Sequence, residues 1–397
     1  MTRALWVTTE PPDRNLGGGS IREAYLLEAL AKKAETHLLL AGTLEDTQTR
    51  AVLAGVTEVD VPARRPPVTR AQRRLDDLRR VLVERQPAAV VENRPRARGL
   101  ADRLPALGAF DLVCVEHDRL GPLIRHRRPG PTRWTLTLHN LPSQRKRHEL
   151  ALAGTRRQRW LYRRELADAR RFEAAMVAAY DLVVVPSDGD ASLLSGDVVV
   201  VPNGVDTARF CPTPLPSEPA LIFTGTLSWG PNIDGLRWFC RQVLPLVRAQ
   251  VPAVRLDVVG REPLSEVEDL ARLPGVRLHA DVPAVVPWLE RARVAVVPLR
   301  IGSGTRIKAL EAMAAGRPVV GTTVGLEGLG IESGVHALVA DEPSRFAAAV
   351  IDLLGNDELA GSVAAAGAEH TRTRFGWDGI GRHFVETLLD LGQTQAR

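Results

Sequence analysis

The chain has 397 residues, of which 45% are hydrophobic and 25% charged, with a formal net charge of +5. These values are typical of a globular protein with two domains or one large one. No run of eighteen apolar residues is present, the start lacks a signal-peptide pattern, and the three cysteines lie far apart. We therefore expect no membrane span, no disulfide framework and no zinc site, and we predict a cytoplasmic protein.

Charge is distributed unevenly. Residues 1–200 hold 33 Lys and Arg against 25 Asp and Glu, whereas residues 201–397 hold 19 against 22. The asymmetry favours two domains with different partners: an acidic ligand, a membrane surface or nucleic acid on the basic half. Arginines cluster in residues 61–104, which we interpret as a solvated amphipathic helix and loop rather than a surface for an acidic acceptor or anionic lipid. Because aromatic residues are not interleaved with the arginines, we expect no nucleic-acid binding.

Short segments rich in Val and Leu alternate with helical segments along the chain. The predicted strands are residues 5–8, 37–40, 58–61, 112–115, 134–138, 182–185 and 198–201, followed by 221–223, 255–259, 276–279, 294–297, 318–321 and 337–339. This alternation predicts an α/β fold with two parallel sheets, hence two Rossmann-like domains. The boundary is predicted in the proline-rich segment after residue 201, which gives domains 1–201 and 202–378. A last helix within residues 379–397 is expected to pack back on the first domain.

The segment after the strand at 294–299 suggests an anion site. It reads Gly-Ser-Gly over residues 302–304 and leads directly into a helix. Free amides and the positive end of the helix dipole favour phosphate there. Arg306 and Lys308 add two cations that a helix start disfavours unless an anion binds. The dinucleotide fingerprint fails, because Ile307 replaces its third glycine, and no P-loop spacing is present. Taken alone, the segment is better interpreted as a tight turn with surface cations.

Glu311 sharpens this interpretation. It is the one acid on a helix otherwise built of small apolar residues. A carboxylate in such a place needs hydroxyl or cationic partners, and vicinal ribose hydroxyls supply them in dinucleotide sites. A nucleoside diphosphate satisfies both features, with phosphates on the loop and ribose on Glu311. The alternative is a helix acid that points to solvent.

The residues also carry a family resemblance. The stretch "GSGTRIKALEAMAAGRPVVGTTVGLEGL" resembles the nucleotide-binding motif of GT-B-fold retaining glycosyltransferases, the glycosyl transferases group 1 family. The stretches "VVPNGVDTARF", "LIFTGTLSWGPNIDGLRWF" and "TLTLHN" resemble other parts of that family. The resemblance implies two Rossmann-like domains facing across a cleft. It also implies hexosyltransferase-like transfer from a nucleoside-diphosphate sugar (UDP or GDP) to an acceptor hydroxyl, with retention of configuration, no metal ion and no cofactor.

The resemblance assigns roles to individual residues. His139 and Glu311 are the implied catalytic residues, with His139 near the sugar and β-phosphate and Glu311 on the ribose. Gly17, Gly18 and Gly19 form the implied phosphate or acceptor loop. The implied donor-binding residues are Gly225, Thr226, Arg261, Val282, Ser303, Gly304, Thr305, Arg306, Lys308 and Glu311. Without its position in this pattern, His139 is better interpreted as a cap on a buried strand end. The three glycines can alternatively form only a flexible turn before the next helix.

Two departures from the family pattern stand out. Many members carry two glutamates with seven residues between them, and Ser303 lies at the position of the first when Glu311 is the second, which puts the identity of the donor sugar in question. The loop at residues 225–232 lacks the Arg and Lys that many members carry, so we hypothesise that Arg306 and Lys308 replace them.

Asp188 and Asp190 match the letters of an Asp-X-Asp metal motif but are interpreted as the start of a helix.

Alternatives remain at this stage. One is a sugar-nucleotide epimerase or hydrolase, and another is an inactive GT-B protein that binds nucleotide sugars or serves as a scaffold. The implied partners are a nucleotide sugar and an acceptor glycan, lipid or small molecule, in glycan or natural-product biosynthesis. Peripheral contact with the inner face of a membrane, through the basic N-terminal half, is one option.

Overall fold

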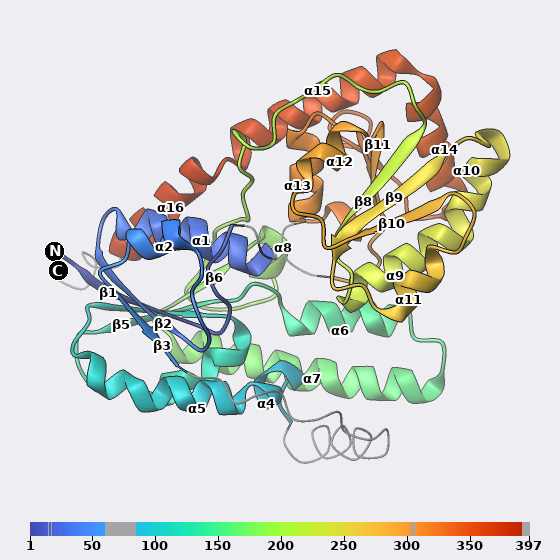
Figure 1. The fold of residues 1–397 in the computed structure, drawn as a ribbon. Coiled ribbons are helices and arrows are strands. Elements are labelled where there is room, and N and C mark those ends of the chain that lie inside the picture. Colours follow the sequence, from blue (N-terminus) through green and yellow to red (C-terminus); the bar gives the residue numbers. More distant parts are fainter. Residues whose placement is uncertain (15, 17, 60–84, 303–305, 391–397) are drawn as a thin grey trace. The chain divides into compact units, whose positions relative to one another are not determined.

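The computed structural model describes residues 1–14, 16, 18–59, 85–302 and 306–390. The chain divides into two compact units, residues 1–201 with 381–397, and residues 202–380. Each unit is built around one parallel sheet (Figure 1). Within the described ranges, no helix is long and apolar enough to cross a membrane.

The N-terminal unit contains a seven-stranded sheet in the order β3-β2-β1-β4-β5-β6-β7. Its strands are β1 (Arg3–Thr8), β2 (Glu35–Leu40), β3 (Gly55–Glu58), β4 (Leu112–Glu116), β5 (Arg133–Thr137), β6 (Leu182–Val185) and β7 (Val198–Val200). Its helices are α1 (Gly18–Ala31), α2 (Thr47–Ala51), α4 (Ala88–Glu92), α5 (Arg94–Arg103), α6 (Pro142–Ala151), α7 (Arg156–Ala179) and α8 (Asp188–Ala191). Figure 1 shows α1 on one face of this sheet and α5 on the other.

The C-terminal unit contains a six-stranded sheet in the order β10-β9-β8-β11-β12-β13. Its strands are β8 (Ala220–Thr226), β9 (Arg255–Arg261), β10 (Val276–Ala280), β11 (Val294–Val297), β12 (Val319–Gly321) and β13 (Leu338–Val339). Its helices are α9 (Gly230–Trp238), α10 (Leu244–Gln250), α11 (Ser265–Leu270), α12 (Val286–Glu290), α13 (Ile307–Ala314), α14 (Pro343–Gly355) and α15 (Asp357–Arg374). Helices α9, α10 and α14 supply the core on one face of the sheet, and α12 and α13 supply it on the other.

The parallel α/β architecture expected from the sequence is confirmed, and a strand is present at or beside every predicted position. One strand is displaced: we expected residues 58–61, but β3 spans Gly55–Glu58. Its register with β2 runs from His37 opposite Gly55 to Leu40 opposite Glu58. In this register the last residue of β2, Leu40, lies opposite the last residue of β3, Glu58.

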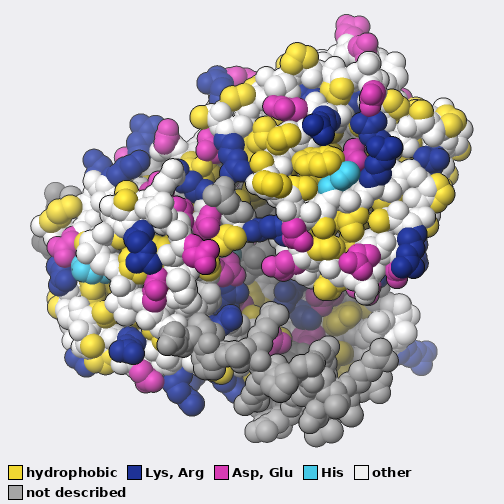
Figure 2. Space-filling view, in the orientation of Figure 1, with side chains coloured by type: hydrophobic (Ala, Val, Ile, Leu, Met, Phe, Trp, Pro, Cys, Tyr) yellow, Lys and Arg dark blue, Asp and Glu magenta, His cyan; other side chains and the backbone are white. Residues whose placement is uncertain are grey.

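Residues 60–84 of the Arg-rich segment lie outside the described residues, and its later part forms α4 and α5. The membrane contact suggested for this segment therefore stays a prediction. On the face drawn in Figure 2, Lys and Arg side chains of the N-terminal unit lie among Asp and Glu side chains rather than in one block.

The last described helix, α16 (Trp377–Asp390), carries its C-terminal part to the N-terminal unit. Phe384 is fully buried, and its ring meets that of Trp6 on β1 edge to face, with 6.0 Å between centroids. Gly381 allows this approach, because a Cβ at that position would lie 2.9 Å from the methyl group of Ala29 on α1. The helix is thus an integral part of the N-terminal core.

We predict that Phe384→Ala lowers the free energy of unfolding of the N-terminal unit by about 3–5 kcal/mol, because the substitution leaves a cavity beside Trp6. Hydrogen exchange of β1 and β4 is the measurement, and it is expected to accelerate. Glu386→Ala, on the exposed side of the same helix, is the matched control and is expected to change stability by less than about 0.5 kcal/mol. Equal protection in the two variants would contradict this packing role.

Candidate functional site

Polar side chains gather at the carboxyl edge of each sheet, at the point where the strand order reverses. In the N-terminal unit this point lies between β1 and β4, and in the C-terminal unit it lies between β8 and β11. Open parallel sheets bind ligands at such switch points, because the connections leave in opposite directions and open a crevice. The two clusters are described separately.

In the C-terminal unit, Lys308 of α13 reaches across to the end of β8. Its Nζ donates a hydrogen bond to Oδ1 of Asn232 at 2.6 Å. The amide nitrogen of Asn232 in turn donates to the carbonyl oxygen of Thr226 at 2.7 Å. Gly225 makes the approach feasible: its φ is +148°, and a Cβ there would lie 2.8 Å from both Lys308 Nζ and Asn232 Nδ2. The predicted residues Gly225, Thr226 and Lys308 are therefore brought together.

The charges on α13 are poorly solvated. Burial, reinforced by the positive charge of Arg306, lowers the pKa of Lys308 to about 7. Burial also raises the pKa of Glu311 to about 7, against the opposing influence of Arg209 and Lys308. The ammonium group lies 4.0 Å from the ring centroid of Phe223, a cation–π contact. Two groups that titrate near neutrality, one turn apart on one helix, are typical of a functional site.

Arg306 has a different environment from Lys308. Its side chain is 4% exposed; its Nε donates to the carbonyl oxygen of Val324 at 2.8 Å, and its Nη2 lies 3.4 Å from the carboxylate of Glu327. Arg306 therefore stabilises the turn at residues 324–327, and Lys308 alone of this pair reaches the end of β8.

The loops after β8, β9 and β10 are tied to one another. Ser228 Oγ donates to the carboxylate of Glu262 at 2.9 Å, and the backbone N–H of Glu262 donates to Asp281 Oδ1 at 3.0 Å. Glu262 and Asp281 both have positive φ, +53° and +52°, a conformation that non-glycine residues seldom adopt. These bonds hold the backbone beside the predicted residues Arg261 and Val282.

Some predicted residues cannot be placed. Gly17, Ser303, Gly304 and Thr305 lie outside the described residues, so their roles stay predictions. Gly18 opens helix α1, and Gly19 follows it in the first turn. Asp188 and Asp190 form the start of α8, where Ser187 caps the helix by accepting a hydrogen bond from the N–H of Asp190.

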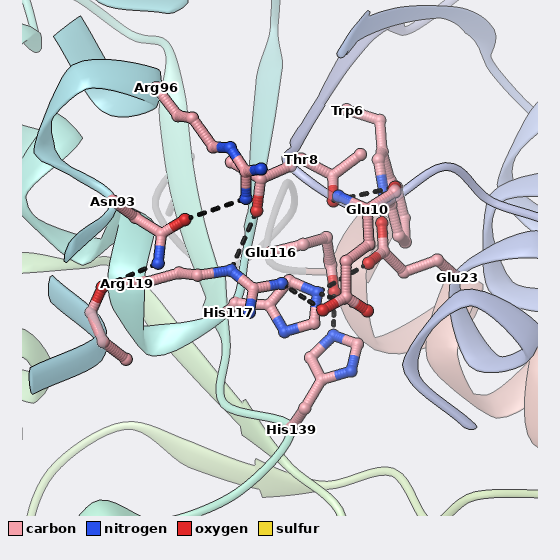
Figure 3. A network of polar contacts seen from close by, with 12 residues as sticks. Trp6, Thr8, Glu10, Glu23, Asn93, Arg96, Glu116, His117, Arg119 and His139 are labelled. Carbon is pink, nitrogen blue, oxygen red and sulfur yellow. Dashed lines mark hydrogen bonds and ion pairs between the residues drawn. The ribbon is translucent and has the colours of Figure 1, made fainter. Parts of the chain in front are cut away.

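In the N-terminal unit, His139 is part of a buried network drawn in Figure 3. Its Nε2 lies 2.8 Å from Oε2 of Glu116, the last residue of β4. The other oxygen of Glu116 accepts from Thr137 Oγ1 at 2.9 Å. The next residue, His117, places its own Nε2 2.8 Å from Oε1 of Glu23 on α1.

The two histidine rings are stacked, with 3.9 Å between centroids and 25° between planes. His117 has φ of +70°, a conformation that costs about 1–3 kcal/mol outside glycine and is often kept for function. A Cβ on Gly19 would lie 3.6 Å from His139 Nδ1 and 2.6 Å from a carboxylate oxygen of Glu10. Gly19, in the first turn of α1, therefore lies directly beside the network.

Burial keeps this network close to neutral. It raises the pKa of Glu23 to about 8 and that of Glu116 well above its usual range, with each carboxyl further disfavoured by another acid nearby. Burial also lowers the pKa of His117 to about 4 and that of His139 well below its usual range. Protonated carboxyls and neutral imidazoles are thus the stable forms near neutral pH.

One group within the described ranges has the composition and spacing of a metal site. Ligand atoms of Glu23, His117 and His139 all lie within 4.8 Å of one another. In this structure, however, Nε2 of each histidine already lies at hydrogen-bond distance from a carboxyl oxygen.

Several of these residues were not predicted from the sequence. Glu23, Glu116, His117 and Asn232 each depend on a partner that is distant along the chain. Their positions in the sequence could have indicated them. Glu116 and His117 lie at the end of one Val-rich strand and His139 lies just after another strand, and the carboxyl ends of parallel strands share one edge of the sheet. Asn232 gave no comparable signal, because it lies inside a helix.

The C-terminal unit matches a protein family. Residues 218–356 match the family model described as Glycosyl transferases group 1. This unit is similar to glycosyl transferases group 1 over most of its length. The resemblance seen in the sequence is thereby confirmed, and the matched segment contains both Lys308 and Glu311.

Curated relatives match over parts of their length. A GDP-mannose-dependent α-(1-6)-phosphatidylinositol monomannoside mannosyltransferase of Mycobacterium tuberculosis is 29% identical over 214 residues, which are 47% of this chain and 54% of that protein. An uncharacterized 44.6 kDa protein in the cps region of Klebsiella pneumoniae is 25% identical over 144 residues, 34% of this chain and 37% of that protein. The matches thus span about half or less of the relatives.

Solved structures match the fold over nearly the whole chain. Sucrose-phosphate synthase from Thermosynechococcus elongatus has a TM-score of 0.77 at 16% identity, covering 99% of this chain and 100% of that one. HepE of Anabaena, in complex with UDP and glucose, has a TM-score of 0.66 at 13% identity, covering 98% and 100%. The predicted fold class, GT-B with two Rossmann-like domains, is confirmed.

We predict that Lys308 titrates near pH 7 and that its two charged neighbours shift this value in opposite directions. Arg306→Ala removes a positive charge and is expected to raise the pKa of Lys308, whereas Glu311→Ala removes a negative charge and is expected to lower it further. The measurement is the pH dependence of Lys308 acetylation, followed by peptide mass spectrometry. If both substitutions shifted the pKa of Lys308 in the same direction, the charges of Arg306 and Glu311 would not be what sets that pKa.

Proposed function

We propose that the protein is a retaining glycosyltransferase that moves a sugar from a nucleoside-diphosphate sugar to an acceptor hydroxyl without a metal ion. The observation that carries the proposal is the pair Lys308 and Glu311 on α13, at the switch point of the C-terminal sheet, in the segment that matches glycosyl transferases group 1. The cation suits a diphosphate, and the carboxylate suits ribose hydroxyls.

The donor nucleotide is assigned to the C-terminal unit. Its diphosphate is placed near Lys308 and the amide groups at the start of α13, and its ribose on Glu311. Binding of the diphosphate stabilises the ammonium form of Lys308, whose pKa of about 7 leaves it only partly charged without an anion. The predicted contacts of Ser303, Gly304 and Thr305 belong to this assignment.

Transfer replaces one bond at the anomeric carbon by another. The bond to the diphosphate oxygen breaks, the acceptor oxygen bonds from the same face, and the acceptor proton passes to the leaving phosphate. Lys308 and the helix dipole stabilise the charge that develops on the leaving group. His139 of the N-terminal unit is assigned to the sugar and β-phosphate.

Names of relatives guide the choice of substrates to test. One curated relative is named as GDP-mannose-dependent, and solved relatives contain UDP or UDP-glucose. We therefore propose GDP- and UDP-sugars as donors. The acceptor is proposed to be a hydroxyl group of a glycan, a lipid or a small molecule.

We predict that UDP or GDP raises the thermal midpoint of the protein, because a ligand bound only by the folded state stabilises it by about 2.7 kcal/mol at a hundredfold excess over Kd. Glu311→Ala is expected to weaken this binding by roughly 10- to 100-fold, the loss of charge-assisted hydrogen bonds to ribose. The exposed Glu358→Ala in the same unit is the charge-matched control. If the nucleotide raised the thermal midpoint of Glu311→Ala and of the wild type equally, Glu311 would not bind the ribose.

We predict that the product keeps the anomeric configuration of the donor and that turnover survives exhaustive treatment with EDTA. NMR coupling constants of the product establish the anomer, and a donor panel of GDP- and UDP-hexoses supplies the substrate. An inverted anomer would contradict retention, and activity restored only by a divalent cation would contradict metal independence. Donor hydrolysis with every acceptor tried would favour the hydrolase alternative.

A further inference from the structure

Two carboxyl–imidazole pairs lie side by side in the N-terminal unit (Figure 3). Glu116 pairs with His139, and Glu23 pairs with His117, each with 2.8 Å between a carboxyl oxygen and Nε2. Both carboxyl side chains are fully buried, and the histidines are 8% and 6% exposed. Each of these buried hydrogen bonds needs one proton between the carboxyl oxygen and Nε2. Whether that proton belongs to the carboxyl or to the ring decides whether Nδ1 of the ring is a donor or an acceptor.

The proton has two arrangements. An ionised carboxylate accepts from Nε2–H, which leaves Nδ1 as a bare acceptor. A protonated carboxyl donates to Nε2, which leaves the ring proton on Nδ1 as a donor. The second oxygen of each carboxyl already accepts a hydrogen bond, from Thr137 Oγ1 for Glu116 and from Trp6 Nε1 for Glu23. Each acid therefore has one oxygen acting as an acceptor and directs the other at an imidazole, an arrangement that fits either position of the proton.

The surroundings favour the protonated form. Glu10 is paired with Arg119, and its negative charge disfavours ionisation of Glu23; a charge on Glu23 in turn disfavours ionisation of Glu116. The stacked rings, 3.9 Å apart, disfavour two imidazolium ions for the same reason. The raised pKa values of Glu23 and Glu116 and the lowered values of both histidines agree with this arrangement. The cations that face the cluster, Arg22 and Arg119, oppose the imidazolium form of His139. They also favour the carboxylate forms of Glu116 and Glu23, but burial has the larger effect on the pKa of both acids.

We propose that Glu116 and Glu23 are positioning residues that hold His139 and His117 as neutral Nδ1–H tautomers, so that His139 presents a hydrogen-bond donor beside Gly19. In Figure 3 the second nitrogen of His139 points away from Glu116, and it lies 3.6 Å from the Cβ position of Gly19 at the start of α1. An Nδ1–H in this place donates to a phosphate or hydroxyl oxygen, whereas a bare Nδ1 repels a phosphate oxygen and can only accept from a hydroxyl. This use of His139 rests on the proposed function, but the tautomer itself does not.

The direct test is NMR of the full chain labelled with ¹⁵N-histidine, without ligand, near pH 7.5. Long-range ¹H–¹⁵N correlations distinguish Nδ1–H from Nε2–H, and His139→Gln and His117→Gln identify the two rings. The expected result is an Nδ1–H tautomer for both. An Nε2–H tautomer or an imidazolium at either ring would overturn the proposal, whatever the activity of the protein.

The variants of Glu116 add a readout that a purely structural role does not move. Glu116→Gln retains a donor for Nε2 and an acceptor for Thr137, so the Nδ1–H tautomer is expected to persist with kcat within a few-fold of wild type. Glu116→Ala is expected to lose the single tautomer and to lower kcat about 10- to 100-fold, as for other groups that orient a histidine. Loss of the tautomer in Glu116→Gln would overturn the assignment of the proton.

A Zn²⁺ titration followed by the same spectra tests the competing use of Glu23, His117 and His139. The expected result is no stoichiometric binding. Stoichiometric Zn²⁺ binding that shifts both Nε2 signals and is abolished in His117→Gln would overturn the proposal, because the metal would then occupy the nitrogens that the carboxyls hold. Absence of glycosyl transfer with an intact Nδ1–H tautomer would contradict the proposed function and leave the tautomer standing.

Discussion

Desolvation of charge at the carboxyl ends of parallel strands is the constraint on which both clusters depend. Strand ends at a switch point lie against helices on either side, so an acid or base placed there loses much of its hydration. Each such group then needs a proton, a partner or a ligand. The pKa values of Lys308, Glu311, Glu23 and His117 are all shifted toward the neutral form for this reason.

The two units meet this constraint in different ways. The N-terminal unit places carboxyls against imidazoles, and burial favours the neutral forms of Glu116 and His139. The C-terminal unit leaves Lys308 and Glu311 half-buried on one helix, with Asn232 as the hydrogen-bond partner of the lysine. In the N-terminal unit, the result is an imidazole ring held in one orientation. In the C-terminal unit, the result is a lysine and a glutamate that a ligand with phosphates and adjacent hydroxyls can stabilise.

Periodicity and turn chemistry predicted the parallel sheets well, because a buried parallel strand is a continuous run of Val and Leu such as residues 182–185 or 294–297. The strand expected at 58–61 was wrong because strand pairing, not local composition, decides where β3 ends. Local sequence suggested Arg306 and Lys308 as an equivalent pair. The structure separates them, since Arg306 has a carbonyl and a carboxylate within reach at residues 324–327.

By itself, the sequence determined the alternation of strands and helices, the glycine-rich segment and the lone acid Glu311, because these are patterns within short stretches of chain. Only the tertiary structure decided that Glu116 meets His139, that Glu23 meets His117, and that Asn232 meets Lys308. These pairs are separated by 23, 94 and 76 residues. Strand order brings each pair to the carboxyl edge of its own sheet, and no local pattern encodes which side chains form a hydrogen bond there.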